Sequence, residues 1–187
     1  MLERRRTARI DFLLAGGQTA EAVAALDDGG EDYRLSLAYQ HPALLLRLAA
    51  QGGRLEPTLD WLESSGVHVD DEALRDGAAA LRRDGAGDEA DRLLELFYER
   101  RIEQRDFAAS NFLGLAELRL RQQRLSEAQD LIRRMLRVSG APFENHVAAA
   151  KLLLASDQPA MAAQLLSERT GAFPWTARRA CCWQQRK

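Results

Sequence analysis

The stretch FLGLAELRLRQQRLSEA, which runs from Phe112 to Ala128, decides the fold. Its leucine-rich first part ends at a polar break, Gln122-Gln123. After the break, apolar residues recur at i, i+3, i+4, i+7 and i+8, which is the spacing of one helical face: Ala128, Leu131, Ile132, Met135 and Leu136. Ser126 is a good N-cap residue, so we expect the second helix to open there. Two helices joined by a tight turn form an αα-hairpin.

Small residues and turn signals recur along the chain at a similar interval. Ala162 lies 34 residues after Ala128, and Ser156-Asp157 marks the turn before it. Equivalent small residues upstream are Ala22, Thr58 and Ala90, and the steps along the whole series are 36, 32, 38 and 34 residues. Their turns are marked by glycines, at Gly16-Gly17, Gly52-Gly53, and Gly85 with Gly87. Self-similarity at such a period is typical of a repeat architecture.

This pattern resembles the tetratricopeptide repeat (TPR), a helical hairpin with a period of 34 residues. The family's large, leucine, small, small and bulky positions correspond here to Phe112, Leu115, Ala116, Ala128 and Ile132. Gly140 stands where the family often has proline, and in the next unit Pro174 fills that place while His146 replaces the usual aromatic. The resemblance implies an all-α fold, an α-solenoid of about five stacked helix-turn-helix hairpins in a right-handed superhelix.

The regularity of the pattern divides the chain into three regions. Residues 72–174 match best and form the predicted TPR-like array, while residues 1–71 read as degenerate helical repeats. We expect an extra short helix at residues 31–41, because this stretch, Gly29-Gly30 and Pro42 fit the pattern poorly. Residues 175–187 are expected to form a capping helix or the start of a further repeat in a longer protein. An ordinary helical bundle is the alternative fold.

Composition and motifs narrow the function. The formal net charge of -2 provides no global basic field for nucleic acid. None of the three histidines has a His or Cys partner at helical spacing, and the sequence lacks GxSxG, HExxH and P-loop motifs. We therefore expect a protein that is not an enzyme and that has no cofactor and no metal site.

Cysteine usage and hydropathy bear on the compartment. The two cysteines, Cys181 and Cys182, are adjacent, so they form no disulfide framework. No apolar run reaches the ~20 residues of a membrane span, so we expect no membrane insertion. These features fit the cytoplasm, with the periplasm as the alternative if the chain belongs to a longer secreted protein.

The resemblance also implies a binding surface, because in tetratricopeptide proteins the first helix of each unit lines a concave groove. The equivalent positions place these residues in the groove: Arg75, Arg82, Arg83, Leu113, Glu117, Leu120, Arg121, Val147, Lys151 and Leu154. Basic groups beside an apolar strip suit a protein or peptide segment with acidic groups. The lysine and asparagine clamp with which some family members hold a C-terminal carboxylate is absent from these positions.

The predicted function is that of a protein–protein interaction scaffold or adaptor, which binds a partner segment in this groove. One alternative is the regulatory TPR portion of a longer enzyme or transcription regulator. Another is a nucleic-acid-binding helical repeat, since pentatricopeptide proteins use similar hairpins. The net charge and the identities of Arg75, Leu113 and Val147 at the expected base-reading position argue against the latter.

Overall fold

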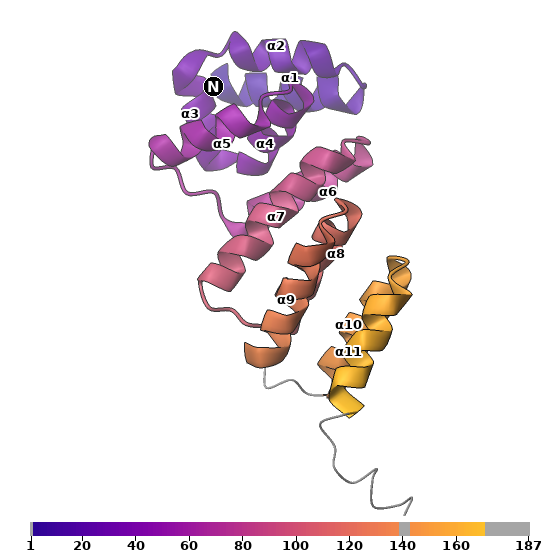
Figure 1. Ribbon diagram of the computed structural model, residues 1–187. Coiled ribbons are helices and arrows are strands. Elements are labelled where there is room, and N and C mark those ends of the chain that lie inside the picture. Colours follow the sequence, from indigo (N-terminus) through magenta and orange to yellow (C-terminus); the bar gives the residue numbers. More distant parts are fainter. Residues whose placement is uncertain (1, 139–142, 171–187) are drawn as a thin grey trace, which may run out of the picture. The chain divides into compact units, whose positions relative to one another are not determined.

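The computed structural model describes residues 2–138 and 143–170, and every regular element in these ranges is an α-helix (Figure 1). The eleven helices of the described residues confirm the all-α fold class. Good helix formers such as alanine, leucine, arginine and glutamate dominate the sequence, and this composition favours helices throughout. The helix predicted for residues 175–187 lies outside the described residues, as do Gly140 and Pro174.

The chain divides into two compact units, residues 1–100 and residues 101–187, and the division falls inside α7. The helices of the first unit are α1 (Leu2–Ala15), α2 (Thr19–Asp27), α3 (Gly30–Gln40), α4 (Pro42–Gln51), α5 (Leu55–Ser64), α6 (Asp71–Arg83) and most of α7 (Gly87–Glu103). Those of the second unit are α8 (Ala109–Arg121), α9 (Leu125–Val138), α10 (Phe143–Ala155) and α11 (Pro159–Thr170). Helix α3 confirms the extra helix predicted for residues 31–41.

Five connections between successive helices share one backbone geometry. Each has a residue with a left-handed φ, between 56° and 82°, and the next helix begins two residues later. In the α8–α9 connection, the N–H of Gln123 donates to the carbonyl of Leu120, and the N–H of Arg124 donates to the carbonyl of Arg119. This pair of bonds defines the Schellman motif, which satisfies the last carbonyls of a helix. The same pair of hydrogen bonds occurs in the other four connections, where the left-handed residue is Gly17, Gly53, Gly85 or Asp157.

The left-handed residue of each turn lies five positions before one of the small residues found in the sequence. The N–H of that small residue makes an early hydrogen bond of the second helix, to the carbonyl of the residue that follows the left-handed one. Among these small residues, Thr58 is half-buried. The four alanines of the series are fully buried: Ala22, Ala90, Ala128 and Ala162. The turns predicted at Gly16-Gly17, Gly52-Gly53, Gly85, Gln122-Gln123 and Ser156-Asp157 are therefore confirmed.

The start of α9 differs from the prediction. Ser126 does not cap this helix, because α9 begins one residue earlier, at Leu125. The carbonyl of Arg124 already accepts from the N–H of Ala128, 3.2 Å away, so the Schellman turn fixes the start without a side-chain cap. Gly87 was likewise expected in a turn, and it is the first residue of α7 instead.

The first unit has α4 at its centre, in contact with α2, α3, α5 and α6. Leu45, Leu46 and Leu48 of this helix are fully buried. Gly77 of α6 allows a close approach, since a Cβ built there would lie 3.1 Å from Cδ1 of Leu93 on α7. In the second unit α8 pairs with α9 and α10 pairs with α11, and α10 also contacts α8 and α9.

Candidate partner-binding surface

Helix α10 carries a row of three predicted groove residues, of which two are exposed and one is half-buried. Its core side consists of the buried Ala149, Ala150 and Leu153. On another side lie the half-buried Val147 and the exposed Lys151 and Leu154, spaced i, i+4 and i+7 along one face. The side chain of Leu154 remains 56% exposed. Predicted positions in α10 thus form an accessible face with apolar and cationic character.

The predicted groove residues of α8 differ from one another in exposure. Glu117 and Arg121 are exposed and Leu113 is half-buried, but Leu120 is only 3% exposed. Leu120 follows Phe112 and Ala116 at intervals of four residues, so it continues their buried row along the helix. The structure therefore places Leu120 in packed surroundings, where its side chain has no open surface to offer a partner.

The three predicted groove residues of α6 lie in the first unit, and two of them contact α7. The guanidinium of Arg75 lies over the ring of Phe97, 5.9 Å from its centroid. Arg82 forms an ion pair with Asp91 at 3.1 Å. Arg83 is exposed, and its Nε lies 3.4 Å from a backbone carbonyl of its own helix. Arg75 and Arg82 thus help to join the helices of one hairpin, and Arg83 makes no such contact with α7 among the described residues.

A shallow hollow of about 300 Å³ in the first unit has its main charged groups engaged with each other. It is lined by Ala50, Gly53, Leu55, Glu56, Pro57, Asp88, Glu89 and Arg92. Nε of Arg92 donates to the Glu56 carboxylate at 2.6 Å, and this bond holds the pKa of Glu56 below its ordinary value. The bonded carboxylate in turn raises the pKa of Arg92. This pair joins α5 to α7, and we interpret it as structural.

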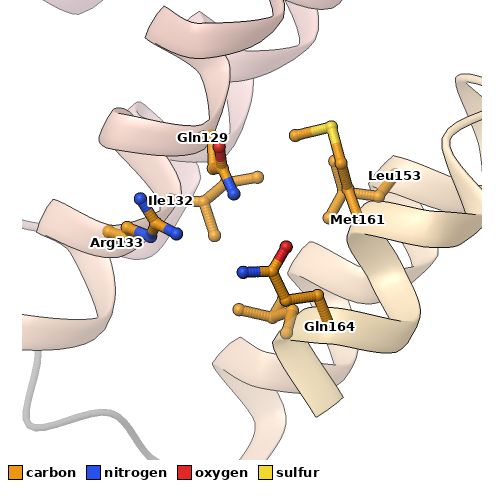
Figure 2. A pocket seen from close by; sticks show the side chains of 7 residues that line it. Gln129, Ile132, Arg133, Leu153, Met161 and Gln164 are labelled. Carbon is orange, nitrogen blue, oxygen red and sulfur yellow. The ribbon is translucent and has the colours of Figure 1, made fainter. Parts of the chain in front are cut away.

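A second gap lies between α9 and the α10–α11 hairpin, and its volume is about 10 Å³ (Figure 2). Side chains of Gln129 and Arg133 on α9 approach it from one side, and Met161 and Gln164 on α11 approach it from the other. A space of this size is no larger than about one water molecule, whereas small-molecule sites are usually ~300–1,000 Å³. This gap is a packing feature of neighbouring helices.

Residues 2–138 and 143–170 contain no group of three or more His, Cys, Asp or Glu side chains that could hold a metal ion. No helix within the same ranges has the length and apolar character to cross a membrane.

Comparison with known protein families and curated proteins found no match.

Two exposed phenylalanines were not singled out from the sequence. Phe143, at the start of α10, and Phe12, near the end of α1, have largely exposed side chains. A helical wheel places Phe12 opposite the apolar row of its own helix, a signal that the sequence did contain.

Proposed function

We propose that this chain is a protein–protein interaction scaffold or adaptor, and that the exposed face of α10 is its main contact with a partner segment. The observation that carries this proposal is the row of Val147, Lys151 and Leu154. The five recurrent turns support a TPR-like α-solenoid, in which each hairpin is one unit and first helices such as α10 offer the binding face.

The chemistry of the row suggests what the partner segment carries. Burial of an apolar side chain such as Leu154 yields about 1.5–3 kcal/mol when exposure is lost completely, and less for a side chain that is already half covered. Lys151 is exposed and makes no ion pair within the described residues, so its ammonium group is available to a carboxylate. The partner that fits is therefore a protein or peptide segment with an apolar anchor and acidic groups.

The α10–α11 hairpin offers a matched pair of leucines for the test. Leu154 lies on α10, and Leu166 lies on α11 with 40% of its side chain exposed. We would introduce Leu154→Glu and Leu166→Glu separately and confirm by circular dichroism that both variants remain helical. Each variant and the wild type would then be used to capture cross-linked proteins from an extract of the source cells, with quantitative mass spectrometry.

We expect that the wild type and Leu166→Glu capture the same specific partners and that Leu154→Glu loses them. A second variant, Lys151→Glu, should weaken the same partners, and its effect should diminish at high salt. Equal retention by all folded variants would show that the face of α10 is not the binding surface.

A further inference from the structure

The outer side of α1 carries a phenylalanine that the fold does not use. Ile10, Leu13 and Leu14 are buried in the first unit, but Phe12 is 75% exposed, more than any other large apolar side chain described. Phe12 continues an exposed row that also contains Arg5, Ala8 and Ala15, at i, i+3, i+7 and i+10. These residues recur along one side of the helix, opposite its core row.

Arg5 belongs to this row, and the exposed Arg4 and Arg9 flank it, with one exposed carboxylate, Asp11, beside them. Arg4, Arg5 and Arg9 form no ion pair with another described residue. Arg5 and Arg9 are four residues apart, an arrangement in which like charges destabilise a helix. Arg6 differs, because its Nη1 lies 3.4 Å from the carbonyl of Gly29 and its guanidinium lies over the ring of Tyr33. The packing of the fold thus accounts for Arg6 and not for the other three.

We infer that this outer side of α1, which we name the α1 face, binds an acidic amphipathic helix of a partner protein. The small Ala8 and Ala15 flank Phe12 and let a second helix approach closely, so an apolar side chain of that helix would cover the ring. Carboxylates on either side of its apolar row would reach Arg4, Arg5 and Arg9. Guanidinium groups suit this role because their planar fork binds a carboxylate with two hydrogen bonds.

An anionic membrane is the competing occupant, and the composition of the α1 face argues against it. Helices that lie in a membrane interface bury a whole apolar face between the lipids. The apolar face of α1 is already buried in the protein core, and among the described side chains of this helix Phe12 is the only large apolar one on the outer side. This amount of apolar surface suits a contact with one helix. The inferred contact lies in the first unit and is independent of the face of α10.

A designed peptide tests the inference directly. The probe is a fluorescein-labelled helical peptide of about 20 residues, long enough to hold its helix, with a leucine seam flanked by glutamates. A peptide with lysines in place of the glutamates is the charge control, and vesicles of phosphatidylcholine with phosphatidylserine form the membrane arm. Binding to the full chain is measured by fluorescence anisotropy for the peptides and by co-sedimentation for the vesicles.

The variants separate the α1 face from general cationic charge. Arg5→Glu with Arg9→Glu removes two cations of the α1 face, and Phe12→Ala removes its apolar anchor. The matched control is Arg133→Glu with Arg137→Glu on α9, because these arginines are also exposed and also four residues apart. Leu154→Glu is included because it alters the other proposed surface only.

We expect saturable binding of the glutamate peptide that falls at least about tenfold with either change to the α1 face. Binding should be unchanged in both control variants, absent for the lysine peptide, and weaker as salt rises from about 0.05 M to about 0.5 M. The inference is overturned if the glutamate peptide does not bind or if the α9 control loses as much affinity. It is also overturned if phosphatidylserine vesicles bind while the peptide does not.

Discussion

The shared turn geometry makes a sharp prediction, because two of the five left-handed positions are not glycine. Gln123 has φ 61° and Asp157 has φ 56°, whereas the corresponding residues elsewhere are Gly17, Gly53 and Gly85. A residue with a Cβ pays about 1–2 kcal/mol in this region, and Asp tolerates it better than Gln. Glycine removes that strain but loses about 0.4–1 kcal/mol through the greater entropy of its unfolded chain. Gln123→Gly should therefore raise the free energy of unfolding by about 0.5–1 kcal/mol.

The reverse change tests the same reasoning at a third turn. Gly85 has φ 82°, and a Cβ built there meets no atom within 4 Å. Gly85→Ala therefore adds backbone strain without a clash, and it should lower the free energy of unfolding by about 0.5–1 kcal/mol. Gln122→Gly is the control, because Gln122 has φ -77° and is not strained. Glycine at this position should destabilise through chain entropy and through loss of the hydrogen bonds that Arg119 and Arg124 donate to the Gln122 side chain.

Urea unfolding followed by the helical circular dichroism signal gives these free energies, provided that each variant keeps the wild-type m-value. We expect the free energy of unfolding of Gln123→Gly to be higher than that of the wild type, and those of Gln122→Gly and Gly85→Ala to be lower. If Gln123→Gly is no more stable than Gln122→Gly, the left-handed turn at Gln123 is not the conformation in solution, and the common geometry of the five turns is refuted.

Three further predictions concern individual contacts. Asp70 accepts a hydrogen bond from the N–H of Ala73 at 2.7 Å as the N-cap of α6, so Asp70→Ala should cost about 1 kcal/mol in urea unfolding, and Asp70→Ser should restore most of it. Ala128 of α9 is fully buried and α9 packs against α8, so Ala128→Leu should overpack the core of this hairpin and cost about 1–3 kcal/mol by the same measurement. Arg92 lowers the pKa of Glu56, so this carboxylate contributes stability above its unfolded-state pKa, and the contribution is lost as pH falls through the folded pKa. Stability measured from about pH 6 to about pH 3 should therefore fall more in the wild type than in Glu56→Gln.

The helical class and the turns could be predicted because both depend on local chemistry. Glycine pairs, Gln122-Gln123 and Ser156-Asp157 interrupt apolar patterns, and a Schellman turn occupies a fixed place relative to the helix on either side. The residue five positions after the left-handed one therefore has the same place in every second helix, and its burial at four of the five sites favours alanine there. The same local chemistry misled the prediction at Ser126, since a hydroxyl that could cap a helix is not needed where a turn already supplies the first bond.

Interactions of the predicted groove arginines could not be predicted, because they depend on which residues of other helices lie opposite. Arg75 and Arg82 look alike in the sequence as basic residues on the open side of a first helix. In the structure one lies over Phe97 and the other pairs with Asp91, and both partners are on α7. The helical period gives the direction of a side chain but not its contact partner. It therefore cannot distinguish an arginine that pairs with a neighbouring helix from one that is accessible to a ligand.

The accessible leucine of α10, by contrast, follows from geometry that the sequence already contains. Leu152, Leu153 and Leu154 are consecutive, and successive helical residues point about 100° apart, so the three side chains cannot all face one core. Ala149 and Ala150 place the core side nearest Leu153, which is buried, while Leu152 is half-buried and Leu154 is exposed. Helix α8 has leucines at Leu113, Leu115, Leu118 and Leu120, and only Leu113 retains appreciable exposure. Helix α10 with three leucines thus leaves one of them exposed, whereas α8 with four packs all but Leu113 into the core, and this difference is why the proposed binding face rests on α10.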